Sequence, residues 1–147
     1  NQRYQSAIPT LQETATLTHG DIDQLNVIWG TDDQPTLIDW ESARLMNPTQ
    51  EIVRTSLSWS GIGSDSFSLP LYKHMILTYR QHGAPFEPTH LTAALYSVYG
   101  SMINWIRFNI TVMSKASQPN SEKTAHHEII NAIARIKKID HLMTDLL

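Results

Sequence analysis

One short segment near the start of the chain constrains the fold more than any other. Val27–Trp29 and Leu37–Ile38 are apolar runs, and a polar turn of Gly, Thr, Asp, Gln and Pro separates them. β-branched residues bounded by such turn formers predict a β-hairpin. The hairpin would place Asn26 at the start of one strand and Asp39 at the end of the other, with Asp21 on the loop that leads in. We therefore expect these three oxygen-bearing side chains to converge on one patch.

The spacing of these residues indicates a specific chemistry. His19, Asp21 and Asn26 form the pattern His-x-Asp-x-x-x-x-Asn, which is the spacing of the catalytic loop in kinase-type phosphoryl-transfer enzymes. Such enzymes need a carboxylate that orients the attacking hydroxyl and accepts its proton, and hard oxygen ligands that hold Mg²⁺ against the phosphates. The pattern predicts Asp21 as the catalytic proton acceptor and Asn26 and Asp39 as the metal ligands.

Three sequence blocks in the same order resemble the aminoglycoside phosphotransferase and choline kinase-like family. They are His19–Asp21, Ile38–Glu41 and Pro48–Glu51, and together with their neighbours they cover residues 17–51. The family typically shows His-Gly-Asp-Leu-x-x-x-Asn, Ile-Asp-Trp-Glu and Pro-x-x-Asp/Glu; here Ile22 replaces the Leu and Glu51 the commoner Asp. The resemblance implies transfer of the γ-phosphate of ATP or GTP, with Mg²⁺, to a hydroxyl of an aminoglycoside-, choline- or sugar-like molecule.

The resemblance also implies a fold. In the family an N-terminal lobe precedes the catalytic loop and supplies the nucleotide-facing loop and the phosphate-gripping lysine. Only sixteen residues precede Leu17, and the chain begins with Asn1 rather than Met. We therefore expect a protein-kinase-like C-terminal helical lobe whose N-terminal lobe is absent from this chain, and a chain that is inactive alone. The exposed lobe interface would favour self-association into a homo-oligomer.

The expected architecture is a single domain, residues 1–147, that is mainly α with a small β-hairpin. Residues 17–51 would form the catalytic loop and metal-binding hairpin, and residues 52–147 a helical bundle. Apolar residues at spacings of three and four predict four helices, at residues 51–61, 67–82, 89–114 and 122–146. Gly100 inside the third helix indicates a close contact with another helix, and Ser64, Asp65 or Ser66 is expected to cap the second. Residues 1–16 are interpreted as a loop or the tail of a helix.

Composition excludes several other classes. At 147 residues with 41% hydrophobic residues, the chain is long enough for one domain with a core. A net charge of −3 with dispersed basic residues argues against a nucleic-acid partner. The absence of Cys excludes disulfides and thiol catalysis. No apolar run reaches the roughly 18 residues of a membrane span, so we expect a cytoplasmic protein without a membrane partner.

Other residues near the motif receive lesser roles. His19 is expected to brace the loop by hydrogen bonding rather than to act as a base, and Asp23 to be solvated. Trp105 is expected to be buried, as most aromatic side chains are. The acidic residues of the motif region suit a cationic acceptor, although the metal requires the same carboxylates. The sequence assigns no acceptor-binding residue.

Two alternatives from other functional classes stay open. One is a kinase-like binding module whose carboxylates persist without catalysis. The other is a helical interaction domain in which the His-Gly-Asp run is coincidental. The second alternative predicts that Asp21, Asn26 and Asp39 do not converge.

Overall fold

The computed structural model describes residues 2–115 and 118–147. The α-helices are α1 (Gln2–Gln12), α2 (Pro48–Trp59), α3 (Leu69–Gln81), α4 (Leu91–Lys115) and α5 (Pro119–Leu146). The strands are β1 (Thr16–Thr18), β2 (Val27–Trp29), β3 (Pro35–Leu37) and β4 (Arg44–Met46), and the short 3-10 helices are η1 (Gln24–Asn26), η2 (Trp40–Ser42) and η3 (Pro88–His90). The predicted mainly α fold is confirmed. Among the described residues, no helix has both the length and the apolar surface that a membrane span requires.

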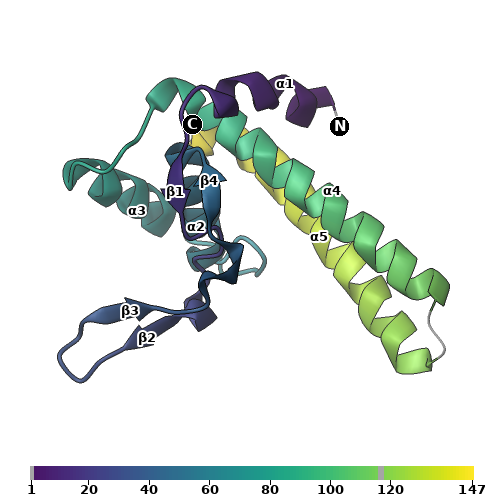
Figure 1. Ribbon diagram of the computed structural model, residues 1–147. Helices are drawn as coiled ribbons and strands as arrows, with labels where there is room; N and C mark the ends of the chain where they lie inside the picture. Colours follow the sequence, from purple (N-terminus) through teal and green to yellow (C-terminus); the bar gives the residue numbers. More distant parts are fainter. Residues whose placement is uncertain (1, 116–117) are drawn as a thin grey trace.

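The predicted hairpin is present. Strands β2 and β3 pair antiparallel, with Val27 opposite Leu37 and Ile28 opposite Thr36. Asp33 in the connecting turn has a φ of 58°, in the left-handed region that Asp tolerates better than most residues. The hairpin extends away from the body of the molecule (Figure 1).

A second two-stranded sheet corrects the expectation of a single hairpin. Strand β1 pairs antiparallel with β4, so that Thr16 lies opposite Met46 and Thr18 opposite Arg44. Neither three-residue segment has a local turn signal that would predict the pairing, since the whole catalytic segment separates them. The pairing matters for the site because β1 leads directly into His19 and β4 leads into the start of α2.

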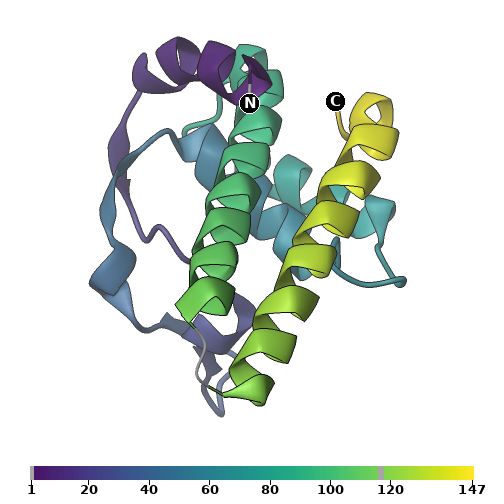
Figure 2. The ribbon, with the colours of Figure 1, turned by 90° about the vertical axis from the view of Figure 1, so that its right-hand side faces the viewer.

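The hydrophobic core lies where α2, α3, the first half of α4 and the end of α5 meet. Its most buried members are Val53, Leu57, Tyr72, Ala94, Leu95 and Ile139. Helices α4 and α5 lie side by side and antiparallel, and their far ends project beyond this core (Figures 1 and 2). The projecting part is correspondingly less buried, and Phe108 and Ile110 there are 56% and 54% exposed.

Helix α1 packs across the first half of α4. The predicted close contact at Gly100 is confirmed, because a Cβ atom at this position would lie only 2.5 Å from Cδ2 of Tyr4. Pro9 lies inside α1, where its missing N–H removes one helical hydrogen bond. Burial of Ala7, together with the Tyr4 contact, keeps this segment helical against that cost.

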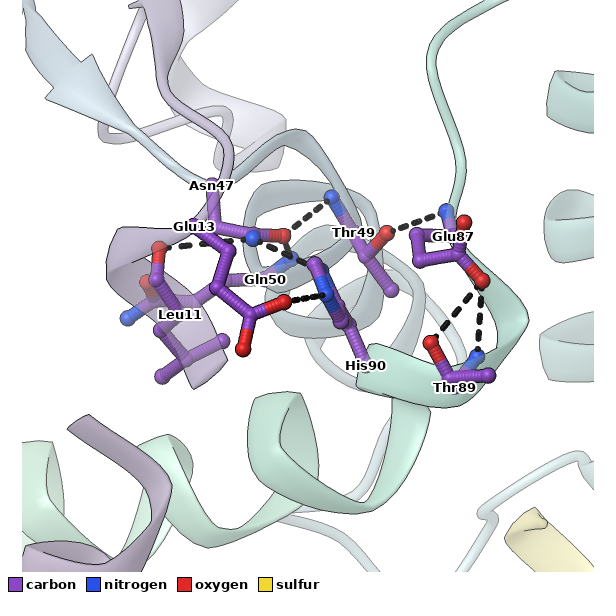
Figure 3. Close-up of polar contacts among 8 residues, drawn as sticks. All are labelled: Leu11, Glu13, Asn47, Thr49, Gln50, Glu87, Thr89 and His90. Atoms are coloured by element: carbon purple, nitrogen blue, oxygen red, sulfur yellow. Dashed lines mark hydrogen bonds and ion pairs between the residues drawn. The ribbon is translucent and has the colours of Figure 1, made fainter. Parts of the chain in front are cut away.

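Helix α2 begins at a cap that also joins neighbouring elements. Asn47 Oδ1 accepts hydrogen bonds from the backbone N–H groups of Thr49 and Gln50, at 3.0 and 3.4 Å. Its Nδ2 donates to Leu11 O at 3.3 Å and to His90 Nδ1 at 3.0 Å (Figure 3). Asn47 therefore fixes the start of α2 against α1 and η3.

The same network continues through His90. Because Asn47 Nδ2 can only donate, His90 accepts through Nδ1 and its Nε2–H faces Glu13 Oε2 at 3.4 Å. On the other side of the cap, Thr49 Oγ1 accepts from the backbone N–H of Glu87 at 2.9 Å (Figure 3). The start of α2 is thus held from both sides.

The start of α3 differs from the prediction. Its cap is Ser68, whose Oγ accepts from the backbone N–H of Leu71 at 3.3 Å. Ser64 and Ser66 instead bond to each other within the preceding loop, at 2.9 Å. The error came from placing the helix start two residues too early.

Candidate active site

Asp21 and Asn26 are in direct contact. Asn26 Nδ2 donates to the backbone oxygen of Asp21 at 2.9 Å and to its carboxylate Oδ2 at 3.3 Å. The turn of η1 makes this contact possible, since it begins at Asp23 and brings Asn26 back over the loop. Two of the three predicted site residues are therefore together.

Asp39 is placed beside them by the hairpin. The backbone N–H of Ile38 donates to Asn26 O at 3.0 Å, and Asp39 follows immediately. Its φ of 63° and ψ of 61° lie in the left-handed region, and its side chain makes no capping hydrogen bond. Non-glycine residues in this region cost roughly 1–3 kcal/mol and concentrate at functional sites.

His19 connects the loop with the hairpin. Its Nδ1 accepts from the backbone N–H of Asp21 at 3.3 Å, so its Nε2–H donates to Ile38 O at 2.8 Å. The ring is 3% exposed and lies 4.5 Å from the ring of Trp40, centroid to centroid. One buried side chain thus holds the backbone on both sides of the site.

The third sequence block contacts the first. The backbone N–H of Gly20 donates to Glu51 Oε1 at 2.6 Å. Gly20 has a φ of 81°, and a Cβ atom there would collide with the backbone oxygen of Ser42 and with Arg44 Nη1. Only glycine fits this position. The sequence assigned no contact to Glu51, and the structure shows that it holds the catalytic loop.

A polar face of α2 forms the floor of the site. Glu51, Arg54 and Ser58 line a cavity of about 100 Å³ together with Asp21. Ser58 Oγ donates to Asp23 Oδ2 at 3.1 Å, so the expectation that Asp23 is merely solvated is wrong. The sequence did contain a signal for this face, because these α2 residues recur at helical spacing opposite the apolar residues of the same helix.

Arg54 is the half-buried cation of this floor. Burial lowers the pKa of Arg54, and the nearby positive charge of Arg44 lowers it further. The carboxylates of Asp21 and Glu51 act in the opposite direction. The guanidinium stays protonated at neutral pH, since arginine does not lose its proton in proteins.

The oxygen atoms at the site suit a hard cation. Both hydrogen bonds made by the Asn26 side chain among the described residues leave from Nδ2, so its Oδ1 is available. The carboxylate of Asp39 is exposed. Within residues 2–115 and 118–147, no three His, Cys, Asp or Glu side chains form a cluster that could enclose a metal. One carboxylate and one amide oxygen fit Mg²⁺, which is normally bound by few protein ligands plus waters and substrate phosphates.

Asn26 contacts Asp21 directly, and Asp39 is linked to them through the backbone bond from the Ile38 N–H to Asn26 O. Comparison with known proteins argues against the alternative in which the His-Gly-Asp run is coincidental. The sequence model of the phosphotransferase enzyme family matches residues 1–82, which is more than half of the chain and includes all three blocks. No curated protein and no solved structure matches the chain.

Proposed function

Because the chain belongs to the phosphotransferase enzyme family, we propose that it forms the catalytic-loop half of a small-molecule kinase. The enzyme transfers the γ-phosphate of ATP or GTP to a hydroxyl of a small molecule. The observation that supports this proposal best is the contact of Asn26 with Asp21, beside Asp39 in its left-handed conformation. It matches the requirement for a carboxylate and adjacent oxygen ligands.

Asp21 acts as the proton acceptor in this proposal. Its carboxylate orients the acceptor hydroxyl and takes the proton as the new oxygen–phosphorus bond forms. The bond between the γ-phosphorus and its bridging oxygen breaks at the same centre, and the nucleoside diphosphate leaves. Asn26 Nδ2, which donates to Asp21 Oδ2, keeps that carboxylate in one orientation.

Asn26 Oδ1 and the carboxylate of Asp39 would hold Mg²⁺. When bound, the ion neutralises charge on the nucleotide phosphates. His19 positions these groups, because it bonds to the backbone of both Asp21 and Ile38.

We place the phosphate-gripping residues in a lobe outside this sequence. The described residues before β1 form helix α1 and no nucleotide-binding sheet. The two sheets also leave large apolar side chains uncovered, including Leu17 and Leu45, which are 70% and 72% exposed on β1 and β4. Exposed apolar surface of this kind is typical of an interaction face, and a second lobe of the same protein would cover it.

The decisive experiment measures acceptor-dependent release of nucleoside diphosphate by the complete protein. Mg-ATP and Mg-GTP are tested separately against a panel of hydroxyl compounds, and phosphorus NMR identifies the phosphorylated product. We expect turnover that Asp21→Asn nearly abolishes. Nucleotide binding without acceptor-dependent turnover would contradict the proposal and favour the non-catalytic binding module.

A further inference from the structure

A second and larger cavity lies beside the candidate site. It is an open pocket with a volume of about 530 Å³, and it is lined by α2, the loop after α2, α4 and α5. Ligand-binding pockets commonly have volumes of about 300–1,000 Å³. Its walls are mostly apolar and include Leu57, Ile62, Val98, Met102 and Trp105. Its size and lining suit a small organic molecule.

The larger cavity shares lining residues with the smaller one at the candidate site. Arg54 and Ser58 line both this cavity and the smaller one that contains Asp21. A molecule held in the larger cavity would therefore contact two side chains that also border the cavity of the proton acceptor. Its Arg54 end would be the end nearest to Asp21.

The cavity lining contains more cationic than anionic side chains. Arg54 and Arg135 are positive, and Glu128 is the single acidic residue among the described residues of the lining. Glu128 Oε2 already accepts from Trp105 Nε1 at 3.1 Å. Trp105 is 46% exposed, which corrects the expectation that it is buried. The lining thus has an excess of one positive charge.

Arg54 lies near the carboxylates of Asp21 and Glu51, but in the described part of the chain neither it nor Arg135 forms an ion pair. A Cβ atom on Gly63 would lie 2.7 Å from Arg135 Nε, so the guanidinium packs closely against the backbone of Gly63. Arg54 is half-buried. In the part of the chain that the structure describes, neither has a carboxylate within 4.0 Å. No side-chain hydrogen bond leaves either guanidinium among the described residues, so both keep N–H donors that a carboxylate can accept from.

We propose that this cavity binds the hydroxyl acceptor and that the acceptor carries a carboxylate, which Arg54 and Arg135 recognise. The planar guanidinium matches a carboxylate through paired hydrogen bonds, and the apolar walls receive the body of the molecule. The role of the ligand as phosphate acceptor rests on the proposed function. The preference of the cavity for an anionic ligand does not. The proposed acceptor is anionic, whereas the acidic residues of the motif region suit a cationic one.

The test uses three probes that differ in one group. They are 4-(hydroxymethyl)benzoate, 4-(hydroxymethyl)benzamide and 4-(hydroxymethyl)benzylamine, which are anionic, neutral and cationic at neutral pH. Titration calorimetry at low ionic strength measures their binding to the complete protein. We expect the benzoate to bind about tenfold or more tightly than the benzamide, as a charge-assisted hydrogen bond provides, and the benzylamine to bind most weakly.

Two variants and a control assign the preference to the cavity. Arg54→Gln and Arg135→Gln should each reduce benzoate affinity towards that of the benzamide and leave benzamide affinity nearly unchanged. Arg135 is exposed, so its substitution leaves the fold intact even if Arg54→Gln does not. Arg107→Gln on α4, which lies outside the cavity lining, should alter none of the three affinities.

The outcomes separate this inference from the proposed function. Equal affinities for the three probes, tighter binding of the benzylamine, or a benzoate preference that survives both variants would overturn the inference. Phosphorylation of the benzylamine but not the benzoate would overturn it and leave the proposed function standing. A benzoate preference that both variants remove, without turnover of any hydroxyl compound, would support the charge preference and overturn the proposed function.

Discussion

Glu51 Oε1 accepts a hydrogen bond from the backbone N–H of Gly20 at 2.6 Å. The bond joins the first turn of α2 to the residue before the proposed proton acceptor. Gly20 is buried, and it lines the same small cavity as Glu51. The catalytic loop therefore depends on a carboxylate that lies beyond the hairpin in the sequence.

Replacing Glu51 should destabilise the protein. Glu51→Ala leaves the buried Gly20 N–H unpaired, and we expect the free energy of unfolding to fall by roughly 1–3 kcal/mol. Glu51→Gln keeps an acceptor oxygen and should lose less. Urea unfolding measures both, with Glu41→Ala as an exposed control. Equal losses for Ala and Gln would show that the acceptor oxygen is unimportant.

Asp21→Asn should remove catalysis and preserve binding. The substitution keeps size and polarity but removes the proton acceptor, and turnover should drop roughly 10²–10⁴-fold. Nucleotide affinity should change far less. The matched control is Asp23→Asn, since Asp23 bonds to Ser58 and is not the proposed base. Turnover at the unmodified rate in Asp21→Asn would assign Asp21 a structural role.

Asp39→Asn should raise the Mg²⁺ requirement. Removing the charge of the single carboxylate ligand weakens binding of the ion. We expect the half-saturating Mg²⁺ concentration to rise roughly 10–100-fold, the range seen when residues that support a metal site are replaced. Activity is titrated with Mg²⁺ at saturating nucleotide. Asp32→Asn in the exposed hairpin turn is the control. An unchanged Mg²⁺ titration would remove Asp39 from the metal site.

Gly100→Ala should show opposite effects in two backgrounds. The new Cβ would lie 2.5 Å from the Tyr4 ring, so the substitution should lower the free energy of unfolding. In a Tyr4→Ala background the clash is gone, and alanine should stabilise α4 by up to about 1 kcal/mol through helix propensity. Thermal unfolding of the four proteins gives the coupling. Additive effects would mean that α1 does not pack against Gly100.

Tyr72 should make the protein sensitive to alkali. Burial raises the pKa of Tyr72 well above the ordinary value of about 10. The folded state therefore favours the neutral phenol, so its contribution to stability is complete below about pH 10 and declines as the pH rises towards the folded pKa. Each pH unit in that window should cost about 1.4 kcal/mol.

The variant Tyr72→Phe tests this dependence. At pH 7 it loses the hydrogen bond from Tyr72 Oη to Leu146 O, 3.3 Å long, and should be less stable by roughly 0.5–1.5 kcal/mol. At pH 11 the unmodified protein should be no more stable than Tyr72→Phe, because the buried phenol then opposes folding. Burial also raises the pKa of Tyr79 and Tyr99, but both are present in each protein, so the difference isolates Tyr72. A gap that is the same at both pH values would contradict the prediction.

The local features of this protein could be predicted from short stretches of its sequence. The hairpin was predictable because turn residues and β-branched runs act over a few positions. The offsets from His19 to Asn26 were informative for the same reason, since one tight loop contains them. Helices α2 to α5 were predictable from the periodicity of their apolar residues. Their ends were misplaced by a few residues, because several neighbouring residues could each act as the helix cap.

The features that join distant segments could not be predicted in this way, because they depend on how the elements pack. The pairing of β1 with β4 and the bond from Gly20 to Glu51 have no local signal, because chain closure over a long segment depends on packing elsewhere. Helix α1 forms despite Pro9 because α4 offers it a surface at Gly100. The charge of the larger cavity was equally hidden: Arg54 and Arg135 come from α2 and α5, and only the packing of these helices places two cations around one space.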